Sequence, residues 1–252
     1  MERIGDILKR AIPNRHLSEN RGTAPEPVYQ CKYCHDAGYV YPLKKDGKPD
    51  YSSSEPCRYC ISPERICMFL GVSSLNTTFK NFKVVKGTED AFKAASMIAT
   101  LETKWKMLLI YGTWGNGKTH LLEAIVLELW AKGYRVKIQT FPDFVAKLKG
   151  TFDKNTEPGG TSFNDIMGYL CLMPYLLLDD VGAAGSFTPF SLAQLERIML
   201  ARYRDNLFTV ITTNLHYEEL PDFVTSRFSD SEKSRIVLNK ALDYRPKKKE
   251  GG

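Results

Sequence analysis

The most constraining feature of the sequence is a glycine-rich octapeptide that joins two apolar runs. The octapeptide, GTWGNGKT at residues 112–119, has the spacing G-x-x-x-x-G-K-[ST]. The run before it, MLLIY at 107–111, is typical of a buried strand, and HLLEAIVLELWAK at 120–132 has the spacing of a helix. A strand that continues through such a loop into a helix is the building unit of an α/β fold with a parallel sheet.

The octapeptide predicts a binding site for a nucleotide polyphosphate. Its glycines allow backbone N–H groups to approach phosphate oxygens, and the N-terminus of the following helix adds a positive potential. Lys118 is expected to contact the β- and γ-phosphates of ATP, and the hydroxyl of Thr119 is expected to ligate Mg²⁺. The alternative, a turn with an accidental lysine, leaves the flanking strand and helix unexplained. The expected nucleotide contacts are Gly112, Thr113, Gly115, Asn116, Gly117, Lys118, Thr119 and His120.

Two later runs end in polar side chains suited to the same chemistry. Asp179 and Asp180 follow the apolar run 175–178, and Asp179 lies 61 residues after Lys118. Because adjacent carboxylates need a cation or water, we expect Asp179 in the Mg²⁺ shell and Asp180 as the base that polarises the attacking water. Asn214 ends a third run, which would bring it near the γ-phosphate if this strand lay between the other two. Taken alone, each element also fits an ordinary turn.

The region after residue 70 alternates short apolar runs with helical spacing. This alternation predicts a parallel sheet with helices on both faces. The expected strands are 107–111, 136–140, 175–178 and 207–212, with 235–238 as a fifth, and the expected helices are 119–132, 142–149 and 190–204. Residues 1–70 differ, because they contain seven of the 13 prolines and five of the six cysteines. We therefore expect a small domain at 1–70 and a nucleotide-binding domain at 71–252.

Four cysteines of the first region form two C-x₂-C pairs. Cys31 and Cys34 are separated from Cys57 and Cys60 by 22 residues, slightly more than is usual in a zinc ribbon. A single pair would also fit a redox dithiol, but two matched pairs favour four thiolates around Zn²⁺. Such a metal would stabilise a segment too short and too rich in proline to fold alone. His35 is expected to be a bystander.

Composition and charge narrow the class of protein. The 252 residues are 43% hydrophobic and 25% charged, and 35 Lys and Arg against 29 Asp and Glu leave a net charge of +6. This mild basic excess permits a nucleic-acid partner without requiring one. No run reaches the roughly 18 apolar residues of a membrane span, and the first 20 residues lack the apolar core of a signal peptide. We expect a cytoplasmic protein without membrane contact.

Residues 71–246 resemble the AAA+ ATPases of the DnaC/DnaI and IstB group. The resemblance is carried by an ordered set of motifs: TFKNF (78–82), GTWGNGKTH (112–120), LLLDDVG (176–182), ITTN (211–214), SRF (226–228) and DYRP (243–246). It implies a AAA+ P-loop core with a truncated lid, since 38 residues follow Asn214. Asp180 stands where many AAA+ proteins have glutamate, and because DnaI-like members share the aspartate, slow hydrolysis is expected.

The resemblance also assigns roles to single residues. It implies that Asn214 is sensor 1, that Arg227 is an arginine finger, and that Arg245 is a sensor-2 or lid contact. An arginine finger acts on the nucleotide of a neighbouring subunit, so a head-to-tail homo-oligomer is expected when ATP is bound. The cysteine module resembles the zinc domain with which DnaI-type proteins bind the hexameric replicative helicase.

Residues 141–171 lie where related ATPases carry extra helices that face single-stranded DNA. Lys147, Lys149 and Lys154 are candidates for contacts to the phosphate backbone, with Phe141 or Phe144 stacking on bases. The alternative is that the aromatic rings belong to the core and the lysines to a solvated face. The basic run RPKKK at 245–249 would add nonspecific attraction to DNA.

These features predict an ATP-dependent helicase loader that uses ATP, Mg²⁺ and Zn²⁺, binds the replicative helicase and helps to load it onto single-stranded DNA. One alternative is an IstB-like transposition helper, with duplex DNA and a transposase as partners. A second is a nucleotide-gated scaffold that binds ATP without useful turnover.

Overall fold

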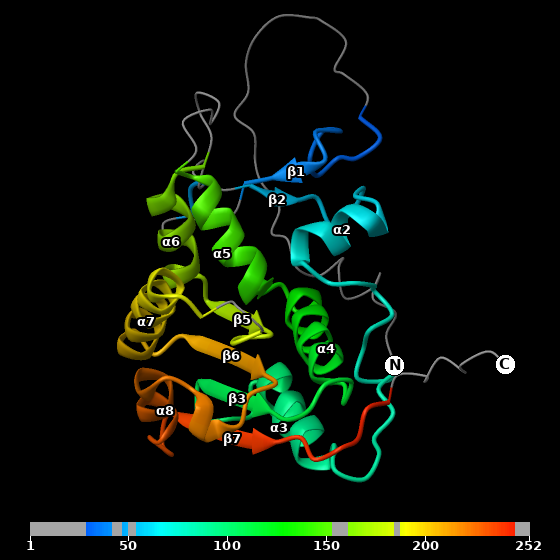
Figure 1. The fold of residues 1–252 in the computed structure, drawn as a ribbon. Coiled ribbons are helices and arrows are strands. Elements are labelled where there is room, and N and C mark those ends of the chain that lie inside the picture. Colours follow the sequence, from blue (N-terminus) through cyan, green and yellow to red (C-terminus); the bar gives the residue numbers. More distant parts are fainter. Residues whose placement is uncertain (1–28, 42–46, 50–53, 153–160, 184–186, 245–252) are drawn as a thin grey trace, which may run out of the picture.

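The computed structural model of the chain describes residues 29–41, 47–49, 54–152, 161–183 and 187–244. Its centre is a parallel sheet of five strands in the order β4-β5-β6-β3-β7 (Figure 1). All four neighbouring pairs are parallel, which confirms the predicted α/β sheet and its fifth strand. The strands are β3 (Met107–Tyr111), β4 (Val136–Thr140), β5 (Tyr175–Asp179), β6 (Phe208–Thr213) and β7 (Ser234–Leu238).

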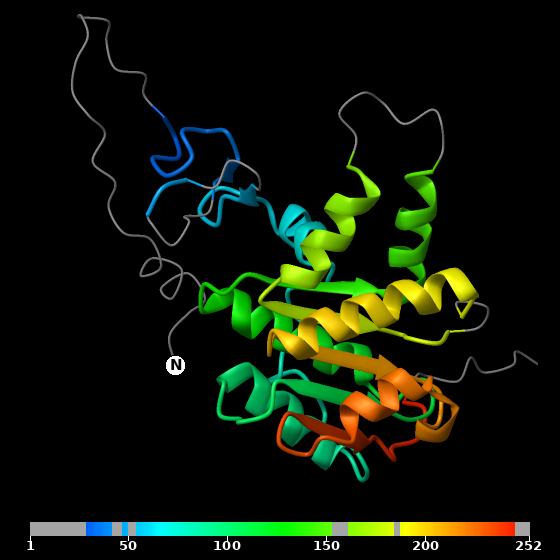
Figure 2. The same ribbon diagram turned by 90° about the vertical axis from the view of Figure 1, so that its left-hand side faces the viewer.

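Helices cover both faces of this sheet, because its strands are apolar on both sides. Leu108 and Ile110 of β3 face one hydrophobic cluster, whereas Met107 and Leu109 face the other. The first cluster is covered by α2 (Pro63–Leu70), α3 (Glu89–Thr100) and α4 (Lys118–Ala131). The second is covered by α5 (Phe141–Gly150), α6 (Phe163–Leu172), α7 (Pro189–Arg204) and α8 (Asp222–Phe228), and a 3₁₀ turn, Tyr217–Glu219, precedes α8. Figure 2 shows α7 and α8 along the face turned to the viewer.

The expectation that Phe141 or Phe144 stacks on bases is wrong. Thr140 ends β4 and caps α5 by accepting a hydrogen bond from the backbone N–H of Asp143. The helix therefore begins directly at the sheet and turns both rings inward, so that Phe141 is 0% and Phe144 1% exposed. Both rings belong to the second hydrophobic cluster, as the alternative interpretation held.

The cysteine-rich segment forms a small module beside the α/β fold (Figure 2). A short antiparallel pair, β1 (Tyr39–Val40) and β2 (Glu55–Pro56), lies between the two cysteine pairs in the sequence. Arg58 donates a hydrogen bond to the carbonyl of Trp130 in α4, and its guanidinium lies 4.9 Å from the centre of the indole ring. The chain then enters α2, whose Leu70 is completely buried in the first cluster. The module is thus attached to the face that carries α4.

Among the helices that the structure describes, none has the length and apolar character needed to cross a bilayer.

Candidate nucleotide site and cysteine cluster

The loop between β3 and α4 has a backbone that requires glycine. Gly112, Gly115 and Gly117 have φ angles of 143°, 72° and 89°, a region that side chains disfavour. A Cβ atom at Gly112 would lie 2.3 Å from the carbonyl oxygen of Asn239, and one at Gly117 would lie 2.9 Å from the ring of Phe82. The loop therefore keeps its shape through close contacts that a larger residue would break.

Lys118 begins α4 and is only 7% exposed. Its ammonium group donates hydrogen bonds to the carbonyls of Gly112 and Thr113, over 2.8 and 2.7 Å, and to Oδ1 of Asn116 over 3.1 Å. The charge is thus held inside the loop, at the N-terminus of a helix, where the helix dipole also favours an anion. The arrangement suits the binding of a phosphate chain.

The polar ends of β5 and β6 meet at this loop. Thr119 donates a hydrogen bond to Oδ2 of Asp179 over 2.8 Å, and Asp179 is 6% exposed. Asn214 donates from its side-chain amide to Oδ1 of Asp180 over 2.5 Å. Because β6 lies between β5 and β3, the strand order meets the condition under which the sequence predicts that Asn214 lies near the γ-phosphate. The structure therefore brings four of the five expected catalytic residues together: Lys118, Asp179, Asp180 and Asn214.

Asp180 occupies a special backbone position just after β5. Its φ angle is 58°, and its backbone N–H donates to Oγ1 of Thr212 over 3.1 Å. Burial raises the pKa of its carboxyl group, and the negative charge of Asp179 raises it further, while the charge of Lys118 opposes both. A carboxylate with a raised pKa is a better proton acceptor, which fits the expected role as a base.

Two of the other expected site residues, His120 and Arg227, have different surroundings. The Nε2 atom of His120 lies 3.0 Å from the carbonyl oxygen of Thr78, and its ring packs edge-on against Phe82 at 5.1 Å between centroids, so it faces the 78–82 segment. Arg227 is half-buried in the last turn of α8, which covers the sheet face opposite α4. Arg245 lies outside the described residues, as does Lys154 of the expected DNA contacts.

Sequence reasoning missed two buried residues that support the site. Asn239 is 1% exposed and exchanges two amide hydrogen bonds with Asn116, donating to its carbonyl over 2.9 Å and accepting from its side chain over 3.1 Å. Thr212 donates to Oδ1 of Asp179. One signal in the sequence could have identified Asn239. It directly follows the apolar run 235–238, just as Asn214 directly follows the apolar strand β6.

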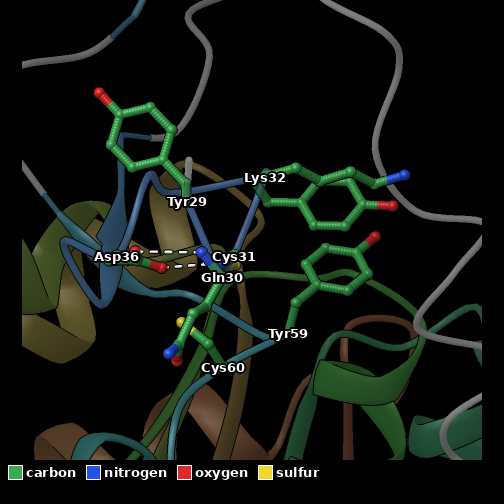
Figure 3. A pocket seen from close by; sticks show the side chains of 8 residues that line it. Tyr29, Gln30, Cys31, Lys32, Asp36, Tyr59 and Cys60 are labelled. Carbon is green, nitrogen blue, oxygen red and sulfur yellow. Dashed lines mark hydrogen bonds between the residues drawn. The ribbon is translucent and has the colours of Figure 1, made fainter. Parts of the chain in front are cut away.

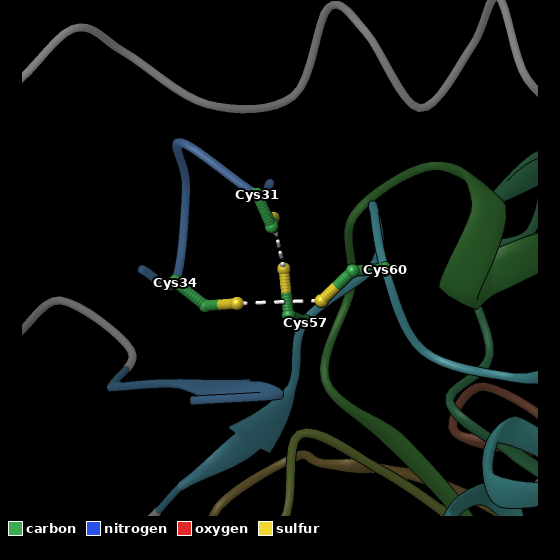
Figure 4. A group of neighbouring side chains, drawn as sticks. All are labelled: Cys31, Cys34, Cys57 and Cys60. Atoms are coloured by element: carbon green, nitrogen blue, oxygen red, sulfur yellow. Dashed lines mark hydrogen bonds between the residues drawn. The ribbon is translucent and has the colours of Figure 1, made fainter. Parts of the chain in front are cut away.

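The four module cysteines form a compact group (Figure 4). Their sulfur atoms all lie within 4.8 Å of one another, with 3.7 Å between those of Cys31 and Cys57 and 3.3 Å between those of Cys34 and Cys60. Sulfur atoms bound tetrahedrally to Zn²⁺ at about 2.3 Å are about 3.8 Å apart, so the group needs little adjustment to hold the ion. His35 does not join the group, since its ring stacks on Tyr29 at 4.4 Å.

The charge balance of the cluster also fits a cation. Burial raises the pKa of Cys31, but hydrogen bonds from the backbone N–H groups of Cys34 and Tyr33 and from the thiols of Cys34 and Cys57 together outweigh it and lower this pKa to about 7. Burial instead raises the pKa of Cys57, and burial with the neighbouring thiols raises that of Cys60. Four thiolates at these distances repel one another unless a cation lies between them.

A surface hollow of about 450 Å³ lies beside the cluster (Figure 3). Tyr33 and Tyr59 line one side of it and stack on each other with 3.6 Å between ring centroids. At its other side, Asp36 accepts hydrogen bonds from the backbone N–H groups of Gln30 and Cys31 over 3.1 and 2.7 Å. These bonds fix the first cysteine pair from outside, as is usual for the surroundings of a structural metal site.

Comparison with known proteins agrees with this geometry. Residues 74–184 match the family of the bacterial DnaA ATPase domain. The replicative helicase loader DnaI of Bacillus subtilis is 31% identical over 129 residues, which cover 51% of this chain and 35% of DnaI. The replicative helicase loader DnaC of Escherichia coli (strain K12) is 27% identical over 157 residues, which cover 62% of each protein. The chain therefore spans less than two thirds of either relative.

Solved structures show the same fold. AMPPCP-bound DnaA from Aquifex aeolicus superimposes with a TM-score of 0.54 at 25% identity, over 64% of this chain and 50% of that one. A crystal structure of DnaI superimposes with a TM-score of 0.55 at 22% identity, over 68% of this chain and 92% of that one. By sequence, the chain is similar to the replicative helicase loaders DnaI and DnaC, and its residues 74–184 match the AAA+ ATPase domain of DnaA.

Proposed function

We propose that the chain is an ATP-dependent helicase loader, which binds the hexameric replicative helicase and helps to load it onto single-stranded DNA. The observation that carries the proposal is the attachment of a four-cysteine module to a AAA+ ATPase domain whose relatives are named replicative helicase loaders. The cysteine module favours this function over an IstB-like transposition helper.

Within the ATPase site, each residue has a distinct task. Lys118 binds the β- and γ-phosphates, and the loop N–H groups orient the phosphate chain. Thr119 and Asp179 are the residues that would hold Mg²⁺, which neutralises phosphate charge when it is bound. Asp180 accepts a proton from the attacking water, and Asn214 fixes the position of that carboxylate.

Arg227 has its task in a neighbouring subunit. Arg227 lies half-buried in α8, which covers the sheet face opposite α4, and in this proposal it acts on the nucleotide of a second copy. Head-to-tail assembly then completes each ATP site with the arginine of the next subunit. ATP binding favours this assembly, and hydrolysis releases it, so the protein acts as a switch.

DNA contact is the least specific part of the proposal. One solved neighbour, at a TM-score of 0.56 and 25% identity, is a DnaA bound to AMPPCP and single-stranded DNA. In the present chain, the exposed Lys149 lies in the last turn of α5, whereas Lys147 donates to the side chain of Gln139. The lysines of this helix, rather than its phenylalanines, are the groups available to a phosphate backbone.

The test is a reconstitution with the replicative helicase of the same organism. Purified chain, helicase and ATP are mixed with closed circular single-stranded DNA, and helicase retained on the circles is measured. A loader increases the retained helicase, and Cys57→Ser abolishes both the increase and the binding to helicase. Cys67→Ser is the control, because Cys67 lies in α2 outside the cluster.

The other outcomes separate the alternatives. Binding to a transposase on duplex DNA, without any effect on helicase, would replace the loader by a transposition helper. Full helicase loading by Asp180→Asn, together with its loss in Lys118→Ala, would show that ATP binding suffices and that hydrolysis is dispensable.

A further inference from the structure

The hydroxyl group of Thr212 connects both acids at the end of β5. It donates a hydrogen bond to Oδ1 of Asp179 and accepts one from the backbone N–H of Asp180. Thr212 lies in β6 and is 1% exposed, so water does not compete for these bonds. A single hydroxyl group on one strand thus fixes two consecutive residues of the next.

The bond to Asp179 decides which way its carboxylate turns. With Oδ1 occupied by Thr212, the other oxygen, Oδ2, is directed at the hydroxyl of Thr119, 2.8 Å away. These are the two side chains that would hold Mg²⁺. A carboxylate free to rotate would spend part of its time in orientations that the ion cannot use, and ordering it would then oppose metal binding.

The bond to Asp180 has a second consequence. The residue adopts a φ angle of 58°, which is unfavourable for a side chain other than that of Asn or Asp. The hydrogen bond from its N–H to Thr212 stabilises this turn, and the turn directs the carboxylate at Asn214. Position 212 therefore controls the geometry of the metal ligand and of the base at once.

We propose that Thr212 is a positioning residue, which orients Asp179 for Mg²⁺ and Asp180 for the attacking water. The inference rests on the proposed ATPase function, and it adds a residue that touches neither nucleotide nor water. Its loss should weaken the part of ATP binding that depends on Mg²⁺, and leave the contacts of the phosphate loop itself intact.

The test compares ATP binding in Mg²⁺ with ATP binding in EDTA, by isothermal titration calorimetry on the full chain. The ratio of the two affinities measures the contribution of the metal. Thr212→Val keeps the shape and removes the hydroxyl, and we expect it to reduce this ratio about 10-fold or more, the usual effect of losing a group that orients a metal ligand. Affinity in EDTA should change less than about twofold. Thr212→Ser should restore most of the ratio.

Thr213→Val is the matched control. Thr213 is also completely buried in β6, but its hydroxyl accepts a bond from the N–H of Leu215 and lies on the other face of the strand. It should lose thermal stability without a change in the ratio. Thr212→Ala, which also lacks the hydroxyl, gives a second measurement if Thr212→Val does not fold.

An unchanged ratio in both hydroxyl-free variants would overturn the inference, as would an equal loss of affinity in Mg²⁺ and in EDTA. Failure of the proposed function has a different signature. If the wild-type chain binds ATP in a Mg²⁺-dependent manner but loads no helicase, the loader proposal fails while the role of Thr212 is still measured by the same ratio.

Discussion

The side-chain amide of Asn214 donates a hydrogen bond of 2.5 Å to Oδ1 of Asp180. The bond connects the ends of two neighbouring strands, β6 and β5. An amide has two N–H donors, so Asn214 can hold Asp180 with one and offer the other to the attacking water or the γ-phosphate. The residue expected to sense the phosphate is therefore coupled directly to the residue expected to act as base.

Replacement of the base should separate ATP binding from hydrolysis. We expect Asp180→Asn to reduce the rate of phosphate release about 10²–10⁴-fold, the usual contribution of a general base, and to leave ATP affinity within about threefold. Lys118→Ala should instead lose measurable binding. Asp222→Asn, an exposed acid at the start of α8, is the control. Equal hydrolysis by Asp180→Asn and wild type would show that another group is the base.

The raised pKa of Asp180 predicts how the rate depends on pH. A base must be deprotonated to accept a proton, so the rate falls as the pH drops through its pKa. Because burial and the charge of Asp179 raise that pKa, kcat/KM should decline with an apparent pKa above the value of about 3.9 usual for aspartate. The measurement is kcat/KM from pH 4 to 8, with circular dichroism at each pH as a control for folding.

Asn214→Ala provides the matched comparison for this pH profile. The amide donates to the charged carboxylate and so favours it, and its removal should shift the acid limb to higher pH. If the apparent pKa on the acid side of the profile is the same in Asn214→Ala and wild type, the hydrogen bond between Asn214 and Asp180 does not persist in the enzyme that binds ATP.

The nucleotide loop could be predicted from the sequence because its chemistry depends on local spacing. The three glycines, Lys118 and Thr119 lie within eight residues, and the strand and helix on either side define how the loop is used. The polar residues at the ends of two further strands, Asp179 and Asn214, could also be recognised, since each follows an apolar run, but the order of the strands came from the structure. By contrast, α3 was not expected. Four of its five buried residues are alanines, so its buried face holds only one large, fully buried apolar side chain, Ile98.

What the sequence could not provide was contact between distant positions. Asn116 and Asn239 exchange hydrogen bonds although 123 residues separate them, and no local pattern marks the pair. The role of Phe141 and Phe144 could not be read from the sequence either, because a phenylalanine ring fits a base-stacking surface as well as a hydrophobic core. Only the position of α5 against the sheet, set by its start directly at Thr140, shows that both rings are buried.

The cysteine cluster predicts one tightly bound Zn²⁺ per chain. Protein purified under reducing conditions without chelator should contain about one zinc by elemental analysis, and Cys57→Ser should contain much less, because three thiolates bind the ion more weakly and Cys57 is completely buried. Cys67→Ser should retain the metal. Absence of zinc from the wild-type protein would contradict the assignment. Removal of zinc should unfold the module first, since binding energy of the metal is part of its folding energy.

Arg227 should act on the ATP of a neighbouring subunit, which mixing of two inactive variants can show. Arg227→Ala keeps an intact phosphate loop, and Lys118→Ala keeps an intact Arg227. If the finger acts in trans, a mixture forms interfaces in which the ATP of the first variant meets the arginine of the second, and ATPase activity reappears. Each variant alone should be about 10³-fold or more slower than wild type.

Arg204→Ala is the control for this experiment, because Arg204 is an exposed arginine of α7 that pairs with the adjacent Asp205. On its own, Arg204→Ala should have the ATPase activity of wild type. Mixed with Lys118→Ala, it should show no activity beyond what it has on its own. A mixture of Arg227→Ala and Lys118→Ala that stays inactive, while light scattering shows that the two variants co-assemble with ATP, would exclude a role in trans. Full activity of Arg227→Ala alone would mean that the half-buried arginine of α8 serves only the packing of that helix.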